Sequence, residues 1–447
     1  MKKKKIFLYS AIALIALILL FLILRFQIPA VQKRIIVFAV WLGAEIYLWY
    51  RVVTTFNFFK NYKQKKRWVK LVEILISILY WMPAFLVAIS LLTLARNTIH
   101  DINTTVYVTI MGASVIQYII KFVIVSLLIP CDIIYSFYIF LKRKKGGIAP
   151  RWRTALLKWA LFIYFIGLGL MSYGMLFVAE SFQIREETLT TSDPDLKENP
   201  LKIVLISDLH AGTWRSQKPV QEIVNIVNQL DAELIFFTGD LVHFTSKELD
   251  PYMPILSQLK AKGGIYSVLG NHDYGTYARF ESEKERKADV ERLVELQRKM
   301  GWTVLNNENV RIQRAGEERD WVIAGIEFYC PTKLFINEGD VDQTYKGIQP
   351  DDRVLLLSHS PEIWDTIKKR DLPAILTVSG HTHGLQIGYY GKKHKWSPAK
   401  ILYKYWGGLY EDPTKKPSYL YVNVGLASVG LPARLGVYPE ITVITLQ

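Results

Sequence analysis

Residues 201–210 read LKIVLISDLH, and this stretch decides the fold of the C-terminal half of the chain. Its first seven residues are mostly apolar and predict a buried strand, which ends directly in the polar residues Asp208 and His210. Two later stretches repeat the pattern of an apolar run that ends in polar side chains, ELIFFTGD (233–240) and GIYSVLGNHD (264–273). Helical patterns at 218–230 and 247–262 separate the three strands, as in parallel α/β units.

The rest of the C-terminal half is richer in strands. After a charged amphipathic helix predicted at 279–300, apolar runs predict strands at 303–312, 321–328, 353–359, 374–380, 419–424 and 437–446. An α/β beginning followed by a strand-rich half predicts an α/β domain in which a two-sheet β-sandwich is flanked by helices. We expect this domain to cover residues 201–447. Residues 181–200 connect it to the preceding part, and the alternation of Phe182 and Ile184 leaves open a first strand there in place of a free linker.

The first 180 residues have the composition of a membrane domain. Crossing a ~30 Å hydrocarbon core takes roughly 20 helical residues, and apolar stretches of about that length run over 6–24, 35–57, 71–95, 106–129 and 155–179. The first stretch follows Lys2–Lys5 but lacks a cleavage site of small residues, so we interpret it as an uncleaved helix. The fourth stays apolar to about Phe140, which predicts a span plus an interfacial turn. Residues 1–180 are therefore predicted to form an all-α membrane domain of about five helices.

The positive charge of the chain is confined to this first part. Residues 1–180 contain 23 Lys and Arg against 5 Asp and Glu, whereas the remaining residues contain 32 against 35. A nucleic-acid-binding domain needs a basic surface, which the C-terminal half lacks, so we expect no nucleic acid partner. With the N-terminus inside, most Lys and Arg fall in the predicted inner loops. This orientation predicts a multi-pass protein of the cytoplasmic membrane with its C-terminal domain outside; a cytoplasmic C-terminal domain is the alternative.

Four charged residues lie in or near the predicted spans, namely Glu45, Glu73, Lys121 and Asp132. Charges inside a membrane mark a functional site, such as a transport pathway, or they are accommodated structurally. In the structural interpretation, Glu73 and Asp132 lie near helix ends, while Glu45 and Lys121 pair or extend to the interface.

Five polar clusters directly follow predicted strands: SDLH (207–210), GD (239–240), GNHD (270–273), SHSP (358–361) and GHTHG (380–384). Because strand ends share one edge of a sheet, we expect these side chains to converge. Oxygen and nitrogen donors without thiolate suit Mn, Fe, Zn or Ni. The donors are too many for one tetrahedral ion but suit two ions that share a carboxylate. The candidate donors are Asp208, His210, Asp240, Asn271, His359, His381 and His383.

The order D-x-H, G-D, G-N-H-D, H and G-H-x-H resembles that of the calcineurin-like metallophosphoesterase superfamily. The tail, from GHTHGLQIG (380–388) to PEITVITL (439–446), is similar to the membrane-associated bacterial branch, which includes phosphodiesterases and UDP-diacylglucosamine hydrolases. The layout of several spans before the esterase also resembles the animal transmembrane proteins with a metallophosphoesterase domain.

The resemblance implies a role for each donor. Asp208, His210 and His383 would hold one divalent transition metal ion. Asn271, His359 and His381 would hold a second ion, and Asp240 would bridge the two. The implied reaction is hydrolysis by hydroxide that the two ions generate from water.

The resemblance also implies that His272 stabilises the transition state or protonates the leaving oxygen. Relatives often carry an acidic residue at position 243, where this chain has His243, so Asp273 is the expected carboxylate partner of His272. Position 385 is Leu385 where this branch often has glycine, which is expected to alter one wall of the pocket.

These observations predict an integral-membrane, dinuclear metal-dependent phosphoesterase that hydrolyses a phosphodiester or phosphoanhydride rather than a monoester. The segment 389–406 is rich in aromatic residues and lysine, which suits the headgroup region of a bilayer. The expected partners are therefore the bilayer and a phosphate ester of the cell envelope, which a lipid-linked substrate would satisfy. Packing of half of these aromatic residues within the protein is the alternative. The alternative function is a membrane transporter or sensor whose outer domain binds metal without catalysis.

Overall fold

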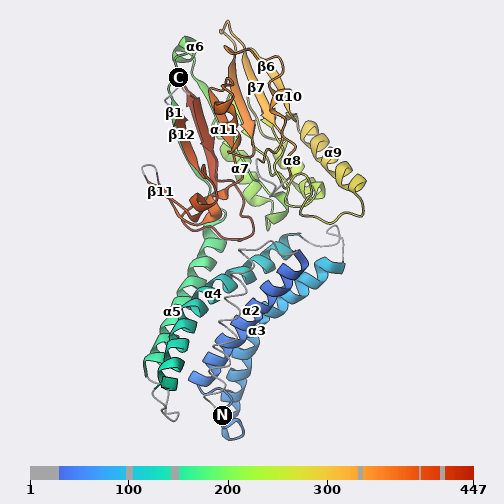
Figure 1. Cartoon of the computed structure of the whole chain (residues 1–447). Helices are drawn as coiled ribbons and strands as arrows, with labels where there is room; N and C mark the ends of the chain where they lie inside the picture. The colour runs from blue at the N-terminus through green and yellow to red at the C-terminus, as the bar shows by residue number, and fades with distance from the viewer. Residues whose placement is uncertain (1–29, 97–103, 142–150, 331–335, 392–393, 413–417) are drawn as a thin grey trace. The chain divides into compact units, whose positions relative to one another are not determined.

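The computed structural model describes residues 30–96, 104–141, 151–330, 336–391, 394–412 and 418–447 (Figure 1). The chain forms two compact units. The helical unit comprises Met1–Ile89 and Ala113–Met171, and the α/β unit comprises Ser90–Gly112 and Ser172–Gln447. The first predicted span, 6–24, lies outside the described residues.

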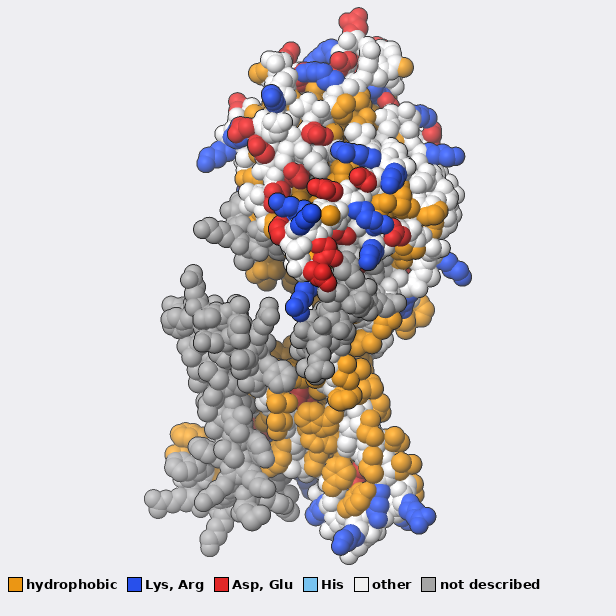
Figure 2. Space-filling view, turned by 90° about the vertical axis from the view of Figure 1, so that its right-hand side faces the viewer, with side chains coloured by type: hydrophobic (Ala, Val, Ile, Leu, Met, Phe, Trp, Pro, Cys, Tyr) orange, Lys and Arg blue, Asp and Glu red, His pale blue; other side chains and the backbone are white. Residues whose placement is uncertain are grey.

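The helical part of the chain contains long apolar helices. Its elements are α2 (Ala30–Thr55), η1 (Tyr62–Gln64), α3 (Arg67–Arg96), α4 (Thr104–Leu141), α5 (Arg151–Tyr173) and the π-helix η3 (Gly174–Val178). Three helical stretches are long and apolar enough to cross a membrane: Arg67–Ile89, Thr104–Ile139 and Arg151–Val178. Hydrophobic side chains dominate the coloured part of the helical unit in Figure 2, and Lys and Arg gather there at one end. Phe85 and Trp159 are each 65% exposed, and such large exposed apolar side chains suit contact with lipid better than contact with water.

The predicted interfacial turn after the fourth span is wrong. α4 continues as one helix to Leu141, with Pro130 inside it. Proline removes one backbone hydrogen bond, but a membrane helix tolerates it where neighbouring groups satisfy the freed carbonyl.

Charged side chains inside the helical unit are paired, which the structural interpretation predicted for Glu45 and Lys121 but not for Asp132. Lys121 Nζ lies 3.0 and 3.1 Å from the two carboxylate oxygens of Glu45. Asp132 forms ion pairs with Arg51 and, at 2.8 Å, with Arg153. Each pair joins different helices, so these charges also fix how the helices pack.

The α/β unit is built on two six-stranded sheets. In spatial order, the first contains β1 (Gln183–Leu189), β14 (Glu440–Leu446), β2 (Leu201–Ile206), β3 (Leu234–Phe237), β4 (Ile265–Ser267) and β5 (Thr303–Val304). The second contains β12 (Gly408–Asp412), β13 (Ser418–Val422), β9 (Leu376–Ser379), β8 (Arg353–Ser358), β7 (Trp321–Ile326) and β6 (Glu308–Ile312). Strands β2 to β5 are mutually parallel, as are β7, β8, β9 and β13.

Helices cover the outer face of each sheet, so every central strand is buried on both sides. Along β2, Ile203 and Leu205 belong to the core between the sheets, whereas Val204 and Ile206 pack with the helices. The first sheet carries α7 (Lys218–Gln229), η5 (Ser246–Tyr252), α8 (Met253–Leu256) and α9 (Glu283–Lys299). The second carries α10 (Val341–Thr344) and α11 (Ile363–Lys369). This arrangement confirms the predicted two-sheet fold flanked by helices.

Several boundaries differ from the prediction. The helix predicted at 247–262 is the short pair η5 and α8, because Pro251 and Pro254 interrupt helical hydrogen bonding. The strand predicted at 303–312 is split into β5 and β6. The connecting segment contains β1, which pairs in parallel with β14, and the short helix α6 (Pro194–Glu198). β1 therefore makes this segment an edge of the first sheet and not a free linker.

Candidate metal centre

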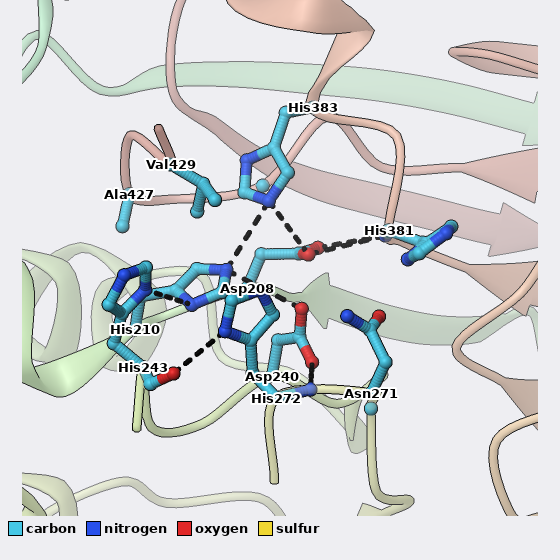
Figure 3. A network of polar contacts seen from close by, with 12 residues as sticks. Asp208, His210, Asp240, His243, Asn271, His272, His381, His383, Ala427 and Val429 are labelled. Atoms are coloured by element: carbon cyan, nitrogen blue, oxygen red, sulfur yellow. Dashed lines mark hydrogen bonds and ion pairs between the residues drawn. The ribbon is translucent and has the colours of Figure 1, made fainter. Parts of the chain in front are cut away.

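The polar clusters meet where the strands of the two sheets end. Asp208 and His210 follow β2, Asp240 follows β3 and Asn271 follows β4, while His359 follows β8. His381 and the first residue of η6 (His383–Gln386) follow β9. Figure 3 shows the donors drawn there turned toward a common centre, with Asp240 between His210 and Asn271. The structure thus brings all seven predicted donors together; their roles as ligands remain predictions.

The first group of donors lies around Asp208. Its Oδ1 is 3.1 Å from His383 Nε2. His383 Nε2 is in turn 3.3 Å from His210 Nε2, and His210 Nε2 is 3.5 Å from Asp240 Oδ2. All four donor atoms lie within 4.8 Å of one another, which is the spacing of ligands around one ion.

The second group shares Asp240 with the first. The same Oδ2 lies 3.2 Å from His359 Nε2, and His359 Nε2 lies 3.2 Å from His381 Nδ1. Asn271 Oδ1 is buried and has no hydrogen-bond partner among the described residues. One carboxylate oxygen therefore faces both groups, and the unsatisfied amide oxygen of Asn271 is a further candidate donor for the second.

The protonation states suit a cation. Burial lowers the pKa of His210 well below its usual value, and burial together with His359 lowers the pKa of His381 to about 3, so both rings are neutral. Burial alone would raise the pKa of Asp240, but His359 and His272 outweigh it and lower the pKa well below the usual value. Burial opposes protonation of His359, yet Asp240 raises its pKa to about 9. A proton on His359 thus supplies positive charge that a metal ion would replace.

The backbone at these strand ends is strained. Five donors have φ in the left-handed region: Asp208 at 56°, His210 at 44°, Asp240 at 57°, His381 at 73° and His383 at 50°. For residues other than glycine this conformation costs on the order of 1–3 kcal/mol each and persists only where the surroundings impose it. The sharp turns aim the side chains back toward one another.

Two glycines make this close approach possible. A Cβ at Gly270 would collide with Asp240 Oδ1, and one at Gly380 would collide with Asp208 Oδ2. Glycine at both positions therefore lets the backbone approach the donors closely.

His272 lies beside the donors and is held from two sides. Its backbone N–H donates to Asp240 Oδ1 over 2.8 Å, which leaves Asp240 Oδ2 facing the two donor groups. Its Nδ1 lies 2.7 Å from the carbonyl oxygen of His243, to which it donates. The ring stacks on Tyr277 with centroids 4.3 Å apart. A donor at Nδ1 leaves Nε2 of the neutral ring with its lone pair available.

The expected pairing of Asp273 with His272 is wrong. Both carboxylate oxygens of Asp273 are used by backbone amides, at 2.8 Å from Asp240, Leu241 and Gly270 and at 3.1 Å from Val242. The carboxylate is buried beneath the loop that carries Asp240, so it shapes that loop and cannot also reach His272.

His243 contributes more than the sequence indicated. Its Nδ1 lies 3.3 Å from His210 Nδ1, on the opposite side of that ring from the donor group. Its amide and that of Phe244 donate to the half-buried Glu248 at 2.6 and 3.1 Å. His243 thus contacts His210 through its ring and His272 through its carbonyl. Only the departure from an acidic residue at this position signalled it in the sequence.

Leu385, the second departure, lies at the edge of the centre. It has a φ of 46°, a conformation that glycine adopts more easily, and its side chain is 36% exposed. Nothing in the sequence pointed to Tyr277 as a site residue. Its hydroxyl accepts a 2.9 Å hydrogen bond from Asn271 Nδ2, and this bond orients Asn271 Oδ1.

Comparison with known proteins agrees with this geometry. Residues 201–385 match the family described as calcineurin-like phosphoesterase. The transmembrane protein with metallophosphoesterase domain of Bos taurus is 33% identical over 259 residues, 56% of this chain and 53% of that protein. Its Danio rerio counterpart is 29% identical over 282 residues, 62% and 60% of the two chains. The uncharacterized metallophosphoesterase YkuE of Bacillus subtilis is 29% identical over 250 residues, 55% and 79%. The chain thus spans little more than half the length of the first two relatives.

Proposed function

Because the chain carries a calcineurin-like metallophosphoesterase domain over residues 201–385, we propose that it is a membrane-bound phosphoesterase that uses two divalent metal ions. The observation that carries the proposal is Asp240 Oδ2, which lies 3.5 Å from His210 Nε2 and 3.2 Å from His359 Nε2. A single buried oxygen between two groups of facing imidazoles is the arrangement that a bridging ligand requires. The first group would hold one ion and the second group, with Asn271, the other.

The residues around the centre have separable tasks. Bound ions supply Lewis acid chemistry, binding phosphate oxygens and activating the attacking water. His272 acts on the substrate itself: Nδ1 is committed to the His243 carbonyl, so Nε2 is the atom that exchanges a proton with the leaving oxygen. Burial lowers the pKa of His272 and outweighs the nearby Asp240 carboxylate, which by itself would raise it.

Metal analysis coupled to hydrolysis tests this proposal. The full chain, purified in detergent, should retain about two transition metal ions and hydrolyse activated phosphodiesters faster than the matching monoesters. The metal that restores the chelated enzyme identifies the cofactor among Mn, Fe, Zn and Ni. A folded chain that binds no transition metal and hydrolyses neither substrate would refute the proposal.

We also propose that the substrate belongs to the cell envelope and that the α/β unit lies outside the cytoplasmic membrane. Within the helical unit, the segment between α2 and α3 and the start of α5 lie at the same end (Figure 1). Both are rich in Lys and Arg, which favours the cytoplasmic side for that end. A reporter fused to the C-terminus tests this: activity of a periplasmic or external reporter supports it, and activity of a cytoplasmic reporter would contradict it.

The alternative, a transporter or sensor with a non-catalytic metal-binding domain, has less support. A degenerate domain typically lacks at least one ligand, whereas all seven donors are present and converge. The buried charges of the helical unit favour structure over transport because they pair with one another.

A further inference from the structure

Exposed hydrophobic side chains of the α/β unit gather in one short segment. Among the described residues from 181 onward, seven large hydrophobic side chains are exposed, and five of them lie between positions 385 and 402. We call these five the apolar rim; they are Leu385, Tyr389, Trp396, Ile401 and Leu402. Ile401 is 81% and Leu402 69% exposed, and a contiguous group of such exposed apolar side chains is uncommon on the surface of a soluble protein.

The segment that carries the apolar rim is well anchored, so its exposure is not a sign of loose packing. Ser397 Oγ donates to the Gly384 carbonyl over 2.5 Å, and Thr382 Oγ1 donates to the Trp406 carbonyl over 2.6 Å. The inner side chains, Tyr390 and Trp406, are buried in a cluster with Ala399, Val424 and Val437. The short hairpin of β10 (Tyr389–Tyr390) and β11 (Lys395–Trp396) and the turn η7 (Pro398–Ile401) hold the other side chains outward.

The apolar rim borders the metal centre at both of its ends. Leu385 follows His383 by two positions. At the other end Leu402 precedes Tyr403, whose ring centroid lies 5.6 Å from that of His381. A surface that accepts the rim would therefore also face the candidate metal site.

The charge of the segment selects the kind of surface. Between Gly384 and Gly408 the sequence has five Lys and no Asp or Glu, although residues 181–447 contain more acidic than basic residues. Lys400 is exposed next to Ile401. Exposed Trp, Tyr and aliphatic side chains mixed with Lys match the headgroup region of a bilayer, where apolar groups enter the acyl boundary and Lys meets lipid phosphates.

We propose that the apolar rim inserts into the surface of the bilayer that carries the helical unit, and that the metal centre thereby acts on amphiphilic phosphoesters held in that bilayer. The docking stands on the exposure and charge of the segment alone. The substrate class rests in addition on the proposed phosphoesterase function, so the two parts are tested separately.

Spin labels measure the docking without reference to catalysis. A nitroxide is attached at Ile401→Cys in the full chain, with Cys131 and Cys330 replaced by alanine, and reconstituted in vesicles of phosphatidylcholine and phosphatidylglycerol. The label should collide more with oxygen, which concentrates in lipid, than with a water-soluble nickel chelate. The matched control is Ile184→Cys on β1, which is 47% exposed in the native chain and should favour the chelate. A chelate-accessible label at 401 overturns the docking, and so does spin–spin broadening at 401, which would indicate a second copy of the chain.

Two substrates with one leaving group test the substrate class. The probes are p-nitrophenyl hexadecyl phosphate in vesicles and p-nitrophenyl ethyl phosphate in solution. Replacing two apolar anchors by Asp, in the variant Ile401→Asp/Leu402→Asp, should slow hydrolysis of the vesicle substrate on the order of tenfold or more. Hydrolysis of the soluble diester should not change, and Ile184→Asp should change neither. Equal losses on both substrates, or none, overturn the substrate class. Wild-type protein that hydrolyses neither probe refutes the phosphoesterase function and leaves the docking to the label experiment.

Discussion

Two regions of this protein bury several charged or titratable side chains, and they satisfy them differently. In the helical unit each buried charge has an opposite charge beside it: Lys121 lies 3.0 Å from Glu45, and Asp132 lies between Arg51 and Arg153. At the candidate metal centre of the α/β unit the buried groups are mostly donors of lone pairs. There His210 faces His383 over 3.3 Å and His359 faces His381 over 3.2 Å.

The difference shows what each region needs from outside the chain. A buried group without a partner costs free energy. The helical unit supplies its own partners, so its polar groups specify helix packing. The candidate metal centre of the α/β unit brings Asp and His donors together with no Lys or Arg among them, so positive charge there would come from protons on imidazoles or from bound cations. The helical unit pairs its charges within the chain, whereas the candidate metal centre holds donors that bound cations would satisfy.

The largest expected effect is the loss of metal. Chelation should abolish phosphoester hydrolysis and destabilise the α/β unit, because an ion present at 1,000 times its Kd contributes about 4 kcal/mol to stability. Hydrogen exchange followed by mass spectrometry should show lost protection at 208–213, 239–244 and 380–386, with α2 and α4 unchanged. If chelation leaves both hydrolysis and hydrogen-exchange protection intact, the α/β unit does not depend on metal and the proposed contrast with the helical unit is wrong.

His272→Ala separates the donors from the residue that acts on substrate. We expect two metal ions to remain bound while kcat falls by about 10²–10⁴, the typical contribution of a positioned acid or base. Metal content and kcat on an activated diester are measured on the same sample. A variant with wild-type kcat would remove His272 from the mechanism.

Lys121→Met breaks a self-satisfied pair in the helical unit. Glu45 would then be a buried charge without a counter-ion, which costs about 3–5 kcal/mol. The double variant Glu45→Gln/Lys121→Met should recover most of this loss, because neither charge is then unpaired. Unfolding in detergent micelles gives the three stabilities. If the single and double variants are equally unstable, the pair does not act as a unit.

The smallest expected effect concerns His243, which lies beside the donor His210. A metal-bound His210 must donate its Nδ1 proton, and His243 Nδ1 is the acceptor at 3.3 Å. Loss of such an outer hydrogen-bond partner typically lowers metal affinity or activity 10–100-fold, and we expect a loss of this size in His243→Ala. His243→Asp should restore much of it because a carboxylate also accepts this proton. Titration of metal into the chelated protein measures the affinity; an unaffected His243→Ala would show that His210 needs no such partner.

Much of the fold was readable from apolar periodicity. The predicted strands at 201–207, 321–328, 353–359 and 419–424 are present with their ends shifted by a few residues. Predictions failed where local sequence was ambiguous: Pro251 and Pro254 shortened a helix, and the two-residue strands β10 and β11 were missed. Strands that short are defined by their pairing partners, which a local pattern does not contain.

The sequence predicted which residues make up the candidate site but not which hydrogen bonds connect them. Motif order alone indicated all seven donors, and the structure brings them together. The partner of His272 was misassigned: Asp273 is its neighbour in the sequence, whereas His243 lies 29 residues away, and only the folded loop after β3 brings the His243 carbonyl to His272.

The sequence by itself determined the two-sheet fold flanked by helices and indicated the candidate donors, because strand periodicity and motif spacing are local properties of the chain. Only the tertiary structure decided which oxygen of Asp240 faces both donor groups, that Asp273 binds backbone amides, and that five apolar side chains beside the metal centre stay exposed. These outcomes depend on where distant segments cross and which hydrogen bonds are already taken, and those are properties of the packed molecule.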